Sequence, residues 1–146
     1  MGEKSHLVAH TDGAAKGNPG PAGFGYTIEQ DGVLLEEYGE YIGEATNNIA
    51  EYRALAAALA RMKQLGAGEV TVYSDSELAV RQIAGEYRVK NEGLKPLYTE
   101  VMNLLTGFSS YHVIHIPREQ NALADRLANK AVKKHSEKKP GAENRR

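Results

Sequence analysis

The chain has 146 residues and a formal net charge of −1, with 41% hydrophobic and 25% charged residues. This length suits one domain with its own core, and the near-zero charge excludes a global basic field for nucleic acid. The absence of cysteine excludes disulfides and thiolate metal sites. We expect a cytoplasmic protein, because no apolar run approaches the roughly 20 residues of a membrane span and the N-terminus lacks the apolar stretch of a secretory signal.

The first part of the chain predicts three antiparallel strands. Residues 6–11 (HLVAHT) alternate as a strand, and residues 12–21 contain the turn-forming pairs DG, GNPG and GP. Two further strand-like runs, residues 23–29 and 33–42, are separated by Asp31-Gly32. Because Asp-Gly between two such runs is a strong hairpin signal, we expect a meander.

The rest of the chain alternates between helices and strands. Asn47 or Asn48 is a suitable cap for a helix rich in strong helix formers, and Gly66 and Gly68 end it. The pattern predicts helices at 47–65, 76–84, 94–105 and 121–134, and strands at 70–74 and 111–116. We therefore expect an α/β fold: a mixed five-stranded sheet, with strands four and five parallel, and helices packed on both faces. Residues 1–135 form one domain, and residues 136–146 are expected to form a disordered polar tail.

Four acidic residues occur where structure alone gives acids little reason to be. Asp12 and Asp75 each end an apolar strand-like run, and Asp125 falls in the first turn of the last helix. Glu51 lies in the helix stripe that should face the sheet, a stripe formed by Leu55, Ala58, Met62 and Leu65. Burying a carboxylate costs a few kcal/mol or more unless a cation or hydrogen bonds offset it. Converging carboxylates therefore indicate a site for divalent metal and phosphoryl-transfer chemistry.

Each of these acids also has a purely structural explanation. Asp before Gly is common in turns, which explains Asp12 equally well. Asp75 is explained as a helix N-cap, unless Ser74 caps that helix with Glu77 at the capping-box position. Glu51 stands near the start of its helix, where a side chain can reach solvent sideways.

Asp125 has the strongest purely structural explanation of the four. Acids are favoured in the first turn of a helix by its dipole. The predicted apolar stripe of this helix, Leu123, Leu127 and Ala131, points away from Asp125. Periodicity thus makes a metal site plausible around Glu51 and the two strand-end acids, but it predicts neither convergence with Asp125 nor a substrate.

The sequence closely resembles the type 1 ribonuclease H family. The resemblance covers residues 6–134 and rests on four motifs that each contain one of the acids, in the family's order. They are TDGAAKGNPGPAGFGYTI (11–28), TNNIAEYRALAAAL (46–59), VTVYSDSELAV (70–80) and HIPREQNALADRLANKA (115–131). The resemblance implies a ribonuclease H-like fold and an endonuclease that cuts the RNA strand of RNA/DNA hybrids, leaving 5′-phosphate and 3′-hydroxyl ends.

The resemblance also implies a metal cofactor, two Mg²⁺ ions or alternatively Mn²⁺. It assigns Asp12 to both ions and Asp125 to the ion that activates the attacking water. It assigns Glu51 and Asp75 to the ion that stabilises the leaving 3′ oxygen. This division suits the chemistry, because phosphodiester cleavage needs charge neutralisation and a nucleophile at neutral pH.

Substrate contacts follow from the same motifs. Asn18 and Asn47 resemble residues that touch the RNA minor groove and its 2′-hydroxyls, the group that distinguishes RNA from DNA. The resemblance adds backbone groups around Gly13, and a pocket for a DNA-strand phosphate formed by Thr46 and Asn91. Capping of a helix by Asn47, a turn at Asn18 and a surface loop at Asn91 are the structural alternatives.

The chain departs from the family's pattern in three places. The segment GEYRVKNEGL is too short for the basic helix-and-loop insertion of many members, so we expect weaker hybrid affinity with a smaller salt dependence. Glu44 stands near the place of an Arg in the phosphate pocket. The mobile His before the last acid is not matched; Arg118 or Glu119 is the candidate substitute, and His115 is interpreted as a structural residue of a strand.

Two rival functions remain at this point. One is a related fold acting as an exonuclease or an integrase-type strand transferase, although the motifs of those proteins differ from TDGAAKGNPG. The other is a catalytically silent hybrid-binding module, against which the four repelling acids argue. In every case we expect a monomer with no membrane association and no obligate protein partner.

Overall fold

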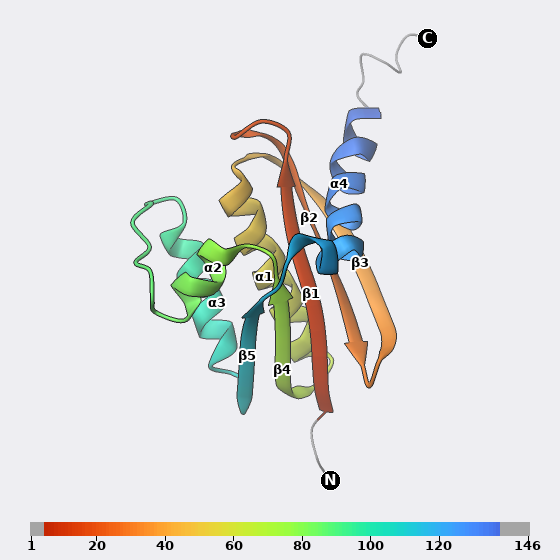
Figure 1. Cartoon of the computed structure of the whole chain (residues 1–146), viewed down its shortest axis with the longest axis vertical. Helices are drawn as coiled ribbons and strands as arrows, with labels where there is room; N and C mark the ends of the chain where they lie inside the picture. The colour runs from red at the N-terminus through yellow and green to blue at the C-terminus, as the bar shows by residue number, and fades with distance from the viewer. Residues whose placement is uncertain (1–4, 138–146) are drawn as a thin grey trace.

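Five strands form one mixed sheet in the computed structural model, which describes residues 5–137. The strands are β1 (Ser5–Ala15), β2 (Gly20–Gln30), β3 (Val33–Ala45), β4 (Ala67–Ser74) and β5 (Ser110–His115). Their order across the sheet is β3-β2-β1-β4-β5 (Figure 1). β2 is antiparallel to β1 and to β3, whereas β4 is parallel to β1 and to β5. The predicted meander followed by two parallel strands is confirmed.

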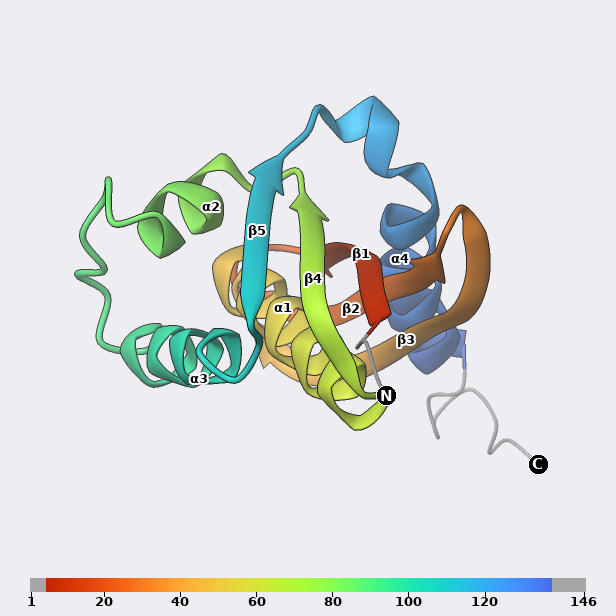
Figure 2. The same cartoon turned by 90° about the horizontal axis from the view of Figure 1, so that it is seen from below.

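Helices cover both faces of this sheet, as predicted. They are α1 (Asn47–Gln64), α2 (Glu77–Ile83), α3 (Lys95–Leu105) and α4 (Ala122–Glu137), with a 3-10 turn, η1 (Arg118–Asn121), leading into α4. α1 packs on β1 and β2 with α3 beside it, and α4 packs on β1, β2 and β3 from the opposite side (Figures 1 and 2). Residues 84–94 connect α2 to α3 without a further helix, so the basic insertion is absent.

The main core lies between the sheet and α1. Alternate residues of β1 and β4 point into it, and α1 contributes the apolar stripe predicted from its periodicity: Leu55, Ala58 and Met62 are fully buried. Each large apolar side chain buried in this way contributes roughly 1.5–3 kcal/mol to folding. Leu65 was expected to extend the stripe, but it is 38% exposed because α1 ends at Gln64.

β1 is longer than the sequence predicts. The turn expected at residues 12–21 is limited to residues 16–19, because β1 and β2 stay paired from Val8↔Glu29 through Asp12↔Gly25 to Ala15↔Ala22. This ladder satisfies backbone groups that a glycine-rich segment would otherwise expose in a turn. The explanation of Asp12 as a turn residue is therefore wrong, since Asp12 is a buried strand residue, 3% exposed.

The buried face of α4 also differs from the predicted one. The apolar residues that are fully buried are Ala124, Ala128 and Val132, whereas the predicted stripe of Leu123, Leu127 and Ala131 is only half-buried. The cause is glycine in β2: a Cβ on Gly25 would lie 2.6 Å from Leu127 Cβ and 2.8 Å from the Ala124 carbonyl oxygen. Because Gly25 has no side chain, the backbone of α4 can lie close to β2 at this point. Alanine side chains fit such a close contact better than leucine side chains.

The last helix is longer than the sequence predicts. α4 continues to Glu137, two residues into the segment predicted as a tail, and the remainder of that segment lies outside the described residues. Within residues 5–137, no helix is long and apolar enough to cross a membrane.

Candidate metal centre

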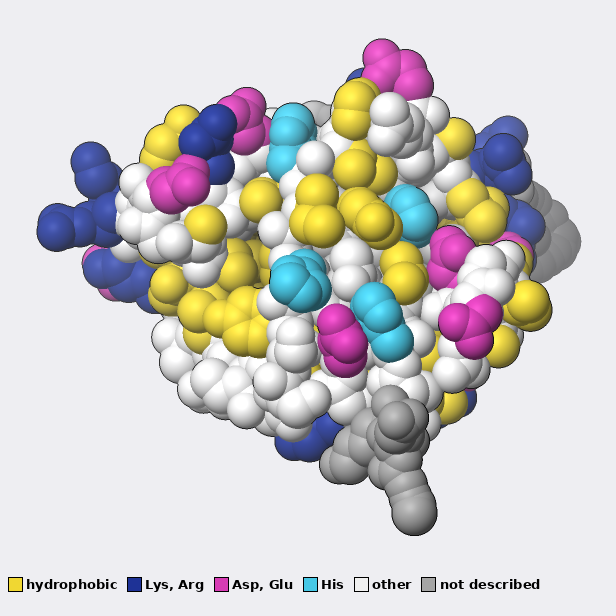
Figure 3. Space-filling model, turned by 60° about the horizontal axis from the view of Figure 1, so that its bottom comes forward, with side chains coloured by type: hydrophobic (Ala, Val, Ile, Leu, Met, Phe, Trp, Pro, Cys, Tyr) yellow, Lys and Arg dark blue, Asp and Glu magenta, His cyan; other side chains and the backbone are white. Residues whose placement is uncertain are grey.

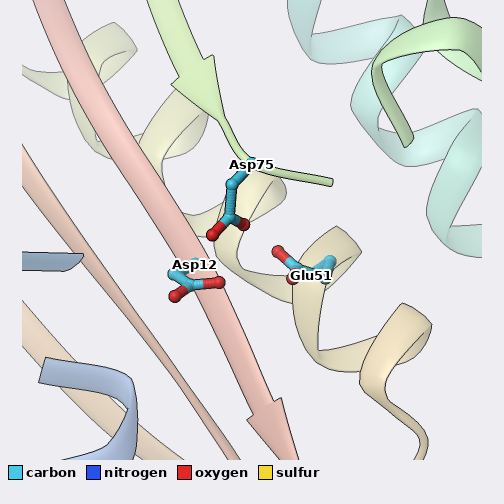
Figure 4. Close-up of side chains that lie close together, drawn as sticks. All are labelled: Asp12, Glu51 and Asp75. Carbon is cyan, nitrogen blue, oxygen red and sulfur yellow. The ribbon is translucent and has the colours of Figure 1, made fainter. Parts of the chain in front are cut away.

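Three of the four predicted acids meet where β4 ends, beside the middle of β1. The parallel ladder of β1 and β4 ends at Thr11↔Ser74, so Asp12 is the next residue of β1 and Asp75 directly follows β4. Glu51 reaches the same place from the first turns of α1. Each of the three offers a carboxylate oxygen, and these oxygens all lie within 4.8 Å of one another (Figure 4). The prediction that distant segments bring these carboxylates together is confirmed for this trio.

The backbone of Gly13 holds two of the carboxylates in place. Its N–H donates to Asp12 Oδ1 at 2.9 Å and to Glu51 Oε1 at 3.2 Å. Glycine is required here for a second reason: a Cβ on Gly13 would lie 2.4 Å from the backbone of Ala50 and Glu51. The missing side chain is what lets α1 approach β1 closely enough for Glu51 to reach Asp12.

The side chain of Asp75 does not cap α2. Ser76 is the N-cap, and its Oγ accepts a hydrogen bond from the Ala79 N–H at 3.2 Å. Ser74, which the sequence suggested as the cap, instead accepts from the Ser76 N–H at 3.0 Å. The N-cap explanation of Asp75 is therefore wrong, and its half-buried carboxylate is free to face the other two.

Asp125 approaches the trio because of the unexpected face of α4. Asn121, Asp125, Ala128 and Val132 share one side of the helix at spacings of four, three and four residues, and three of the four are fully buried. Asn121 fixes this side against the sheet, since its Nδ2 donates to the Thr11 carbonyl at 2.9 Å. Asp125 lines the same hollow of about 380 Å³ as the trio, together with Asn47, Arg118 and Asn129.

Burial and mutual repulsion raise the pKa values of two of the four acids, and a bound cation would offset both effects. Burial, and then repulsion by Glu51, Asp75 and Asp125, raises the pKa of Asp12 to about 10. Burial, and then the charge of Asp75, raises the pKa of Glu51 to about 8, although its hydrogen bonds oppose the rise. Only oxygen ligands are offered, which is the donor set that Mg²⁺ and Mn²⁺ prefer. The residues present therefore fit a hard divalent cation.

We expect the metal-free protein to lose stability as pH rises. Because both pKa values are raised on folding, the folded protein binds more protons than the unfolded chain above pH of about 4. The free energy of unfolding should therefore fall between about pH 5.5 and pH 8, by up to about 1.4 kcal/mol per pH unit for each proton that the folded protein retains. Urea unfolding in the presence of a chelator measures this fall, and saturating Mg²⁺ should reverse it at pH 8. An equal fall in Asp12→Asn would contradict the assignment to these acids.

The predicted substrate residues occupy the rim near the β1–β2 hairpin. Asn47 Oδ1 accepts from the Ala15 N–H at 3.0 Å, and Asn18 Oδ1 accepts from the Asn47 N–H at 2.9 Å. Thr46, rather than either Asn47 or Asn48, caps α1 by accepting from the Ile49 N–H at 3.2 Å. These bonds tie the hairpin to the start of α1, so Asn18 and Asn47 lie on one structural unit.

Two other predicted residues, Asn91 and Arg118, are exposed. Asn91 Oδ1 accepts from the backbone N–H groups of Gly93 and Leu94 before α3. Arg118, whose side chain is 77% exposed, brings a guanidinium nitrogen to 3.8 Å from Asp125 Oδ1. His115, interpreted from sequence as a strand residue, ends β5 opposite Ser74.

The sequence reading missed two residues of the site. Asn121 positions the start of α4, and its spacing of four residues from Asp125 was the available signal. Asn129 lies one turn beyond Asp125, where its Nδ2 donates to Asp125 Oδ1 at 3.2 Å. Asn129 also lies four residues from Asp125, but polar residues at this spacing on an exposed helix are too common to indicate a site.

Several known proteins are similar to this chain in sequence. Residues 10–131 match the family described as "Reverse transcriptase-like". The chain is 43% identical to a bifunctional protein of Mycobacterium tuberculosis over 86% of its own length, and 41% identical to ribonuclease HI of Halobacterium salinarum over 85%. It spans only 35% and 63% of those two proteins. It is 33% identical to ribonuclease H of Francisella philomiragia, with 89% of this chain and 93% of that protein covered.

Solved structures agree with these relatives. Ribonuclease H1 of Halobacterium salinarum superposes with a TM-score of 0.86 at 39% identity, covering 88% of this chain and 98% of the other. LC11-RNase H1, isolated from compost and solved in complex with an RNA/DNA hybrid, gives a TM-score of 0.84 at 44% identity, with the same coverage. The strand order, the carboxylates and these matches lead to one conclusion: the chain belongs to the type 1 ribonuclease H family.

Proposed function

We propose that this protein is an endonuclease that hydrolyses the RNA strand of RNA/DNA hybrids, leaving 5′-phosphate and 3′-hydroxyl ends. The observation that supports this most directly is the convergence of Asp12, Glu51 and Asp75, with Asp125 on the same hollow. The RNA/DNA hybrid bound by LC11-RNase H1, which is 44% identical, supports the choice of substrate.

The four carboxylates would hold two Mg²⁺ ions, with Mn²⁺ as the alternative. Bound ions of this kind neutralise phosphate charge and lower the pKa of water, which supplies both charge stabilisation and a nucleophile. Asp12 is our candidate for the shared ligand, because it is the most buried of the trio and because Glu51, Asp75 and Asp125 all raise its pKa. The Gly13 N–H keeps Asp12 and Glu51 oriented, so little reorganisation is needed before the reaction.

Recognition of RNA would fall to the rim formed by the hairpin and α1. The side-chain oxygens of Asn18 and Asn47 are used within the protein, and no bond from either amide NH₂ group occurs within residues 5–137. These NH₂ groups are donors that suit 2′-hydroxyls and the minor-groove edges of bases. Thr46 and Asn91 remain our candidates for a DNA-strand phosphate pocket, and backbone groups near Gly13 remain candidates for RNA contact.

Arg118 is proposed to assist product release. Its exposed guanidinium lies near Asp125, where it can attract the departing phosphate. Arg118→Ala should lower steady-state turnover about three- to tenfold and leave the single-turnover rate unchanged. Lys63→Ala, an exposed cation at the far end of α1, is the control. Unchanged steady-state turnover in Arg118→Ala would remove Arg118 from the proposal.

An end-labelled hybrid incubated with and without Mg²⁺ tests the function. We expect internal cuts in the RNA strand only, and only with metal. Trimming from the ends would indicate an exonuclease, and a mobility shift without cleavage would indicate a silent binding module. Either result would overturn the proposal.

A further inference from the structure

One side of α4 carries a row of exposed cations. Arg126, Lys130 and Lys133 follow one another at spacings of four and three residues, so they share one helix face, and all three are exposed. Within residues 5–137, none of them lies within salt-bridge distance of a carboxylate, whereas Arg61, Arg81 and Lys95 elsewhere each do. We call these three side chains the α4 row.

The α4 row begins beside the metal centre. Arg126 directly follows Asp125, and a shallow hollow of about 570 Å³ lies along the row. Asp125 and Asn129 line both this hollow and the hollow that contains the trio of acids. At 1.5 Å per residue, the row extends about 10 Å along the helix axis. The row therefore continues along α4 from the Asp125 and Asn129 wall of the active-site hollow.

The remainder of the surface explains why such a row matters. The chain has a net charge of −1, so a polyanion must be attracted locally. The end of the molecule where the parallel strands begin shows Lys and Arg only toward its margins, with hydrophobic and His side chains between them (Figure 3). In the α2–α3 region, Arg81 and Lys95 are paired with Glu77, Glu86 and Glu92. Arg88 and Lys90 of the same region are exposed, but they line neither the hollow of the acids nor the hollow that adjoins it.

We propose that Arg126, Lys130 and Lys133 bind consecutive phosphates of the RNA strand next to the bond that is cleaved. This inference rests on the proposed function. A row of separate cations fits a ligand with repeated negative charges better than a single anion. The RNA strand is assigned because it must pass through the metal centre, so its next phosphates are the first to reach a row that starts one residue from Asp125.

Hybrid binding in a chelator tests the proposal without requiring cleavage. Fluorescence anisotropy of a labelled hybrid, at about 50 to about 200 mM salt, gives Kd and its salt dependence. We expect Lys130→Gln to raise Kd about three- to fivefold and the triple Gln variant about 10- to 100-fold. The slope of log Kd against log salt should fall by about 2–3 in the triple variant. Lys63→Gln, which removes one exposed helical cation on α1, should change Kd less than about twofold.

Two further measurements make the outcome decisive. With Mg²⁺ and subsaturating hybrid, kcat/KM of the triple variant should fall about as far as its hybrid affinity, because the row binds substrate. If wild type cleaves hybrids and the triple variant binds them as tightly as wild type does, the α4 row is overturned and the function stands. If wild type cleaves nothing, the function is overturned, and the anisotropy result still decides whether the row binds hybrids.

Neutral phosphates identify the strand. In a hybrid whose DNA strand carries methylphosphonates, the proposal expects the penalty of Lys130→Gln to persist, since the contacted RNA phosphates stay charged. Loss of that penalty would assign the row to the DNA strand and overturn the inference as stated. Thermal unfolding of each variant, expected to match wild type for exposed substitutions, checks that the fold is intact.

Discussion

Asp12→Asn is expected to lower hybrid cleavage about a thousandfold or more while making the metal-free protein more stable. Activity falls because Asn carries no charge, and Asp12 is the most buried acid of the trio. Stability rises because folded Asp12 keeps a proton at pH 8 that the unfolded chain releases, and Asn carries no such cost, a gain of about 3 kcal/mol or more. Single-turnover cleavage and urea unfolding in a chelator measure the two effects on one sample.

Asp31→Asn is the matched control for this substitution. Asp31 is exposed in the β2–β3 turn with φ of 51°, a conformation that both Asp and Asn tolerate. It should leave cleavage and stability near wild type. An Asp12→Asn enzyme that kept a tenth of wild-type cleavage would contradict the metal role of Asp12, and a loss of stability would contradict the electrostatic account.

Gly13→Ala should produce the largest loss of stability among substitutions around the candidate metal centre. The new Cβ would stand 2.4 Å from backbone atoms of Ala50 and Glu51, and backbone cannot move aside as a flexible side chain does. α1 would have to shift away from β1, which we expect to cost about 3 kcal/mol or more. Glu51 would move with the helix, so cleavage should fall even at temperatures where the variant remains folded.

Thermal unfolding and Mg²⁺ titration calorimetry separate these two consequences. Gly107→Ala is the control, because its nearest contact would be the Leu104 carbonyl oxygen at 3.3 Å and it lies after α3, far along the chain from the acids. Wild-type stability and metal affinity in Gly13→Ala would show that α1 is not held against β1 in the way described.

Strong local patterns predicted most of the fold. The Asp31-Gly32 turn, the alanine-rich α1 and the apolar run of β4 each carry a signal that depends only on near neighbours. Glu51 was predictable for the same reason, since a carboxylate interrupts an otherwise apolar stripe. The length of β1 was not, because Gly13, Ala14 and Ala15 have weak strand propensity and are held in the sheet by pairing with β2.

The position of Asp125 required knowledge of what α4 packs against. Hydrophobicity alone favours Leu123 and Leu127 as the inward residues, but a strand with Gly25 at the contact selects alanines instead. Rotating the buried face toward Ala124 and Ala128 brings Asp125 with it. The resemblance to a known family supplied Asp125 where periodicity could not, because the family's motif already includes the effect of the partner strand.

The two bare positions beside Asp12 have a consequence for protein engineering. Gly13 follows Asp12 along β1, and Gly25 pairs with Asp12 across the ladder. Gly13 lets α1 approach one face of the sheet, and Gly25 lets α4 approach the other. Transplanting the four acids alone onto another sheet would therefore leave them too far apart to share ions. A working graft would also need these two gaps in the side-chain layer, and an alanine scan that passes over glycines would never reveal them.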